Sequence, residues 1–60
     1  MKIKSIVTVD NELTFTNVEI LNMKNIKQLD KAIQNNKVIE IRENSETYKF
    51  NSSYIIFYQP

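Results

Sequence analysis

The sequence predicts an α+β fold: a single small domain over residues 1–60 with the element order ββαβββ. Three observations lead to this prediction. Residues 2–9 and 13–21 are rich in β-branched and aromatic residues, as strands are. The following stretch has apolar residues at helical spacing, and residues 38–58 return to the alternation of strands. We therefore expect one antiparallel sheet with a single helix packed on one of its faces.

The first two strand segments predict a β-hairpin with a three-residue loop at residues 10–12. This loop pairs Val9 with Leu13 and Val7 with Phe15, and it places these four side chains on one apolar face. Past Asn17 the apolar residues fall on the opposite parity. A kink at Asn17 would accommodate this change of face.

A helix is predicted from Met23 to Asn35. Asn22 or Asn25 can cap its start, and Gln28 follows Asn25 at the spacing of a capping box. The pair Asn35-Asn36 is expected to end the helix, because asparagine tolerates the left-handed conformation better than other residues in this glycine-free chain. The apolar stripe of the helix consists of Met23, Ile26, Leu29 and Ile33.

A second hairpin is predicted around a two-residue turn at Asn44-Ser45. One of its faces is apolar and the other is charged. A further turn at residues 51–53 leads into a last strand at residues 54–58, which we expect to complete a three-stranded meander. The predicted pairs of the hairpin are Arg42 with Thr47, Ile41 with Tyr48, Glu40 with Lys49, and Ile39 with Phe50.

The last strand presents apolar or aromatic side chains on both faces, and a domain of this size has few elements to cover the second face. Either Ile55 with Phe57, or Tyr54 with Ile56 and Tyr58, is expected to remain outside. We therefore expect an interface on this strand and a homodimer. The candidate interface residues are Tyr54, Ile55, Ile56, Phe57 and Tyr58.

The composition removes most catalytic chemistry. The chain has no cysteine and no histidine, so a disulfide, a Cys/His zinc site and the usual general base are all unavailable. It also has no glycine for a phosphate-binding loop. The acidic residues Glu40, Glu43 and Glu46 have the pattern of a solvated hairpin tip. We expect no enzyme activity, no cofactor and no metal.

These observations favour a non-enzymatic protein-interaction module that binds itself and an unidentified partner protein. Seven lysines against one arginine, with nine isoleucines and eight asparagines, indicate an AT-rich genome. Small inhibitors encoded by phages and mobile elements are the functional type we expect. Charged side chains would steer the partner; the candidates are Lys24, Lys27, Lys31, Arg42, Glu43 and Glu46.

The alternative is a nucleic-acid-binding accessory or regulatory protein, which would use Lys24, Lys27, Lys31 and aromatic residues of the sheet. The net charge of +1 and the lack of a basic block make non-specific binding to phosphates the less favoured hypothesis. The longest apolar or aromatic run has five residues, far below the roughly 20 that span a bilayer. We therefore expect no membrane partner and a cytoplasmic location.

Overall fold

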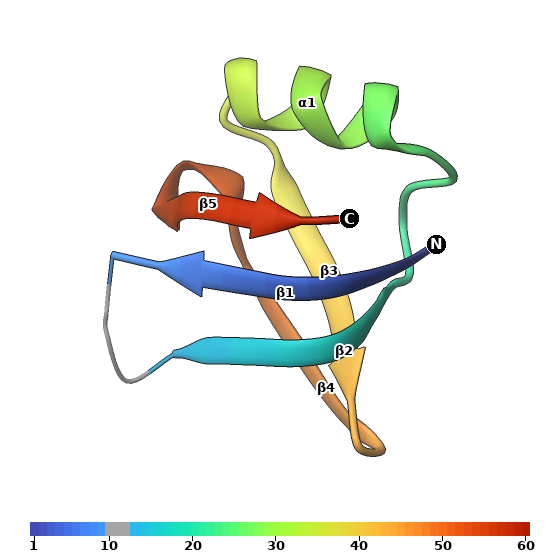
Figure 1. Ribbon diagram of the computed structural model, residues 1–60. Helices are drawn as coiled ribbons and strands as arrows, with labels where there is room; N and C mark the ends of the chain where they lie inside the picture. The colour runs from blue at the N-terminus through green and yellow to red at the C-terminus, as the bar shows by residue number, and fades with distance from the viewer. Residues whose placement is uncertain (10–12) are drawn as a thin grey trace.

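The structure, a computed structural model, describes residues 1–9 and 13–60. It confirms the α+β fold, with one antiparallel sheet, one helix on one face and the predicted order of elements (Figure 1). A single turn of 3₁₀-helix precedes the last strand. The elements are β1 Lys2–Thr8, β2 Thr14–Ile20, α1 Ile26–Gln34, β3 Val38–Glu43, β4 Glu46–Asn51, η1 Ser52–Tyr54 and β5 Ile55–Gln59.

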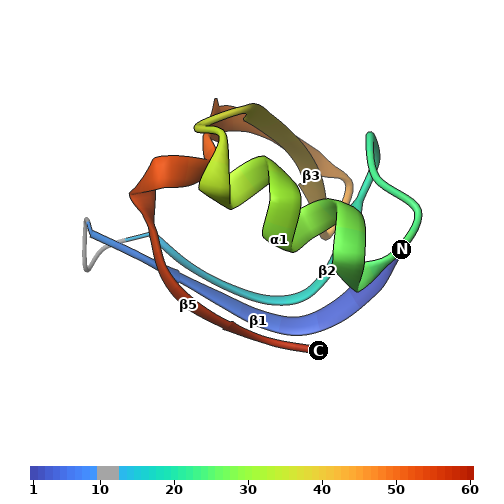
Figure 2. The same cartoon turned by 90° about the horizontal axis from the view of Figure 1, so that it is seen from above.

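The strand order in the sheet is β4-β3-β2-β1-β5. The predicted meander is therefore wrong, because β5 pairs with β1 at the opposite end of the sheet from β4. The cause lies in η1, where Ser52 is fully buried against the end of the helix. Its Oγ donates to the Ala32 carbonyl (2.9 Å) and its N–H donates to the Lys37 carbonyl (2.8 Å). These bonds lead the chain past the helix, which lies across the open side of the curved sheet (Figure 2).

Both caps of α1 form as predicted. The N–H of Gln28 donates to Asn25 Oδ1 (2.9 Å), which makes Asn25 the N-cap, so the regular helix begins at Ile26 and not at Met23. At the other end Asn36 has φ 54°. The Lys37 N–H donates to the Ala32 carbonyl, as in the Schellman motif that usually has glycine at the left-handed position. The apolar side of the helix faces the sheet, with Leu29 and Ala32 buried.

The predicted register of β1 and β2 is wrong by one residue. Phe15 pairs with Ile6, not with Val7, and it is buried, whereas Val9 and Leu13 are exposed. The kink at Asn17 is confirmed by its φ of 51°. The prediction missed a matching change of face in β1. Ile3 and Ile6 are both buried, although regular alternation would place residues three apart on opposite faces of the sheet. The loop at residues 10–12 lies outside the described residues.

The second hairpin matches its prediction in every pair from Arg42–Thr47 to Ile39–Phe50. Both turn residues are left-handed, with φ 51° at Asn44 and 73° at Ser45, as a type I′ turn requires. The two-residue loop thus fixes which side chains of β3 and β4 face the helix. Ile39 and Ile41 are fully buried.

Replacing Ser45 by glycine is expected to stabilise the protein by about 0.5–1 kcal/mol, because a non-glycine residue at positive φ carries a steric cost that glycine lacks. Urea unfolding followed by circular dichroism would measure the gain. Thr47→Gly, two residues further into β4, is the control and should destabilise the protein. A Ser45→Gly protein less stable than wild type would contradict the strain argument.

Eight buried side chains from β1, β2, α1 and β3 form the core. Tyr48 and Phe50 of β4 and Ile55 and Tyr58 of β5 pack against its rim. Both ends of the sheet therefore contribute to one core. The buried residues are Ile3, Ile6, Phe15, Val18, Ile20, Leu29, Ile39 and Ile41.

Candidate functional site

The strand β5 divides its side chains in a way that neither sequence alternative anticipated. Ile55 and Tyr58, three residues apart, pack against the core, while Ile56 and Phe57 point outward and are 58% and 55% exposed. The reason is an irregularity in the pairing of β5 with β1: Phe57 pairs with Val7, but Ile55 pairs with the next residue of β1. One extra residue in a strand makes a β-bulge and shifts the alternation of faces.

The bulge leaves a group of exposed apolar side chains at one end of the sheet. Tyr54, at the end of η1, is 53% exposed, and Val9 is 61% exposed. The Val9 N–H donates to the Tyr54 carbonyl (2.8 Å), so these two residues are neighbours. We call Val9, Tyr54, Ile56 and Phe57 the β5 surface. Sequence reasoning missed Val9, because the predicted register placed it inside the hairpin.

A hydrogen bond joins β5 to the helix. Tyr58 Oη donates to the Asp30 carboxylate, and this bond, together with partial burial, raises the pKa of Tyr58 to about 12 from its ordinary value near 10. The side of β5 that does not pair with β1 is thus tied to α1 at Tyr58. Covering an edge strand with a helix is one way in which proteins prevent further strands from adding.

Tyr58→Phe is expected to cost about 1 kcal/mol of unfolding free energy at neutral pH, because it removes the bond to Asp30. Since the folded state holds the phenol proton more tightly, this stabilisation is complete below about pH 10 and is lost as the pH rises towards about 12. Urea unfolding of both proteins across this range should show the difference between them shrinking. Tyr54→Phe is the control. A difference that does not change with pH would contradict this role of the hydroxyl.

The three candidate lysines do not all lie on the helix. Lys24 precedes α1, and its backbone N–H donates to the Gln28 side chain (2.7 Å). Lys27 and Lys31 are exposed on α1, on either side of Asp30. These two lysines therefore lie on the element that Asp30 joins to β5. Lys31 also lines a shallow cleft of ≈ 400 Å³ between the helix and the start of β3.

The charges at the second hairpin are engaged in local structure. Arg42 donates to Glu19 (2.5 Å), and this bond with the opposite charge lowers the pKa of the Glu19 carboxyl. Glu43 accepts from the backbone N–H of Thr16 (2.8 Å). Glu46 accepts from the Tyr48 hydroxyl (2.9 Å), a bond that raises the pKa of Tyr48.

The carboxylates of Glu19 and Glu43 therefore join β2 to β3, whereas that of Glu46 bonds within β4. Within residues 1–9 and 13–60, no three acidic, histidine or cysteine side chains gather as a metal site would need.

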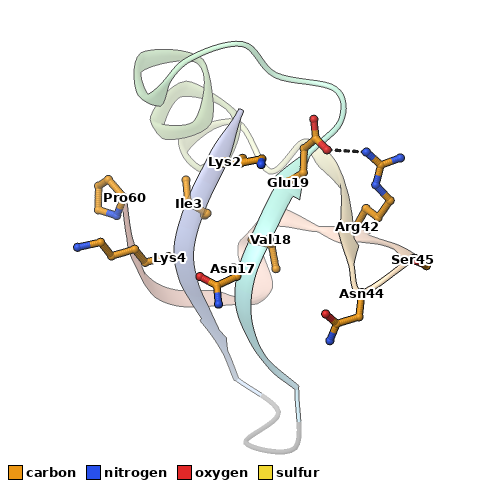
Figure 3. Close-up of a pocket in the computed structure, with 10 residues that line it drawn as sticks. All are labelled: Lys2, Ile3, Lys4, Asn17, Val18, Glu19, Arg42, Asn44, Ser45 and Pro60. Carbon is orange, nitrogen blue, oxygen red and sulfur yellow. Dashed lines mark hydrogen bonds and ion pairs between the residues drawn. The ribbon is translucent and has the colours of Figure 1, made fainter.

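A second, larger cleft crosses β1, β2 and the turn between β3 and β4 (Figure 3). Its volume is ≈ 560 Å³. The pair Glu19–Arg42 spans one side of it, and Lys2 and Lys4 project from β1 (Figure 3). Asn17, where the apolar residues of the sequence change parity, also lines this cleft.

Two of the aromatic residues proposed to stack nucleic-acid bases have structural contacts. The Phe15 ring lies 4.9 Å from that of Tyr48 and 5.8 Å from that of Phe50, measured between ring centres. Tyr48 and Phe50 are half-buried at the rim of the core. Tyr54 and Phe57 are the exposed aromatics, and they lie at the other end of the sheet. Binding to nucleic acid stays a prediction.

No family model, curated protein or solved structure matches the chain significantly. No helix among residues 1–9 and 13–60 has both the length and the apolar content that crossing a membrane requires.

Proposed function

We propose that this chain is a non-enzymatic protein-interaction module that binds protein through the β5 surface. The observation that carries the proposal is the outward display of Tyr54, Ile56 and Phe57, each more than half exposed. Aromatic residues are enriched and charged residues are depleted at the centres of protein interfaces. The β5 surface has this composition, since none of its four side chains is charged.

The area of the β5 surface supports the same proposal. Aromatic side chains carry roughly 150–250 Å², so Tyr54 and Phe57, 53% and 55% exposed, each leave about 100 Å² uncovered. With Ile56 and Val9 the surface reaches roughly 400 Å². The largest apolar patches of monomeric proteins measure about 300–600 Å² and are often functional.

Charged residues of α1, the helix that is bonded to β5, would set the rate and specificity of binding. Lys27 and Lys31 flank Asp30, which bonds Tyr58 of β5. Charges at the rim of an interface act chiefly on the association rate and on the choice of partner. A binder of this size can act by covering the working surface of a larger protein, and inhibition of the type found in phages and mobile elements is the form of activity we propose.

Site-specific photo-crosslinking in the native cell tests the proposal. A benzophenone amino acid at position 57 should give a discrete crosslinked protein band, either with the chain itself or with another protein. The control places the same amino acid at Val38, a 46% exposed apolar residue on β3. Crosslinks of equal yield at both positions, or none at position 57, would refute binding through the β5 surface.

A further inference from the structure

The β5 surface is able to complement itself. Its residues, and all side chains from Tyr54 to Pro60, are uncharged. In a two-fold dimer each residue of a patch meets residues of the same patch, so a charged patch would place like charges together. An uncharged apolar patch avoids this repulsion. The net charge of only +1 also leaves little repulsion between whole copies.

The structure disfavours a partner that adds a strand to β5. The side of β5 away from β1 is tied to α1 through Tyr58 and Asp30, and the bulge at Ile56 disturbs the regular pairing. Bulges and covering helices are the means by which edge strands are protected from pairing. The contact expected at this surface is therefore packing between side chains, and not pairing of backbones along the edge of β5.

The exposed area limits the affinity of such a contact. Two copies packed through the β5 surface bury roughly 800 Å² in total, below the about 1,200 Å² of stable complexes. An apolar contact of this size predicts a dissociation constant on the order of 100 μM. A 60-residue chain with no cysteine gains stability from association of this kind, because its own core is small.

Building on the proposed function, we infer that the protein covering the β5 surface is a second copy of this chain, packed face to face in a weak two-fold dimer. Phe57 is the residue whose substitution should disturb this contact most, since it is a large aromatic side chain, 55% exposed and paired with half-buried Val7.

Analytical ultracentrifugation of the purified chain from about 10 μM to about 1 mM tests this inference. The average mass should rise from 7.1 kDa towards twice that value. Phe57→Lys should raise the dissociation constant at least tenfold, whereas Leu21→Lys, at a 43% exposed apolar residue outside the β5 surface, should leave it unchanged. Circular dichroism confirms that both variants are folded, and the melting temperature of the wild type should rise with concentration.

A chain that stays monomeric to about 1 mM would overturn the inference, and so would a dimer that resists Phe57→Lys. These failures are separate from failure of the proposed function. A monomeric chain that crosslinks from position 57 to a different protein in the cell would retain the proposed function while excluding the self-complex.

Discussion

Leu29→Ala is expected to destabilise the protein by on the order of 2–5 kcal/mol, the usual cost of removing a buried leucine side chain. Leu29 is 0% exposed and is the central contact of α1 with the sheet. Domains of this size have a total stability of roughly 3–9 kcal/mol. The substitution should therefore remove most of the cooperative unfolding transition.

Urea unfolding followed by circular dichroism would measure this effect against two controls. Leu21→Ala makes the same chemical change at a residue that is 43% exposed, and it should cost well under 1 kcal/mol. Leu29→Met keeps the volume and should cost less than about 1.5 kcal/mol. Equal unfolding midpoints for the two alanine variants would show that α1 does not pack through Leu29.

Phe15→Ala is expected to cost about 3–5 kcal/mol. The Phe15 ring contacts Tyr48 and Phe50, with centres 4.9 and 5.8 Å away, so it links β2 to β4 across the inside of the curved sheet. Phe57→Ala is the matched control, since Phe57 is 55% exposed whereas Phe15 is 3% exposed. Measured where the chain is monomeric, Phe57→Ala should have a small effect.

The same measurement tests where the buried part of the first hairpin begins. In the pairing predicted from sequence, Leu13 and Phe15 share a buried face. In the structure β2 begins at Thr14, Phe15 is buried and Leu13 is 41% exposed. A small cost of Leu13→Ala beside a large cost of Phe15→Ala fits this boundary, whereas similar costs for the two would contradict it.

Features governed by neighbouring residues were predictable from the sequence. The turn at Asn44-Ser45 and the caps at Asn25 and Asn36 formed as expected. Each depends on the backbone preference of asparagine or on a bond within four residues. In a chain without glycine, these positions carry a clear signal.

Features governed by distant contacts were not predictable. The alternation of residues in β5 shows that this strand has two apolar faces, but it does not show which strand pairs with it. The strand that pairs with β5 is decided by the hydrogen bonds of Ser52 to Ala32 and Lys37 at the end of α1, which are far from Ser52 in the sequence. The change of face in β1 has no signal in the sequence, because Lys4 and Ser5 lack the tolerance of positive φ that marks Asn17 as the site of a kink.

The candidate surface was predictable in outline. The sequence directed attention to residues 54–58, and the structure retains Tyr54, Ile56 and Phe57 as exposed. Ile55 and Tyr58 pack on the core because the bulge breaks the two-residue period that sequence reasoning assumes. Val9 joins the surface through a register that only the folded hairpin reveals.

The pairing of β5 with β1 also has a kinetic consequence. Ser5 meets Gln59, so this ladder closes a loop of almost the whole chain, and such closures slow folding. During synthesis the first hairpin can form while β5 has not yet emerged from the ribosome. The apolar residues of β5 are thus the last to find their places. Until then β1 keeps an unpaired edge, the form of strand most prone to aggregation.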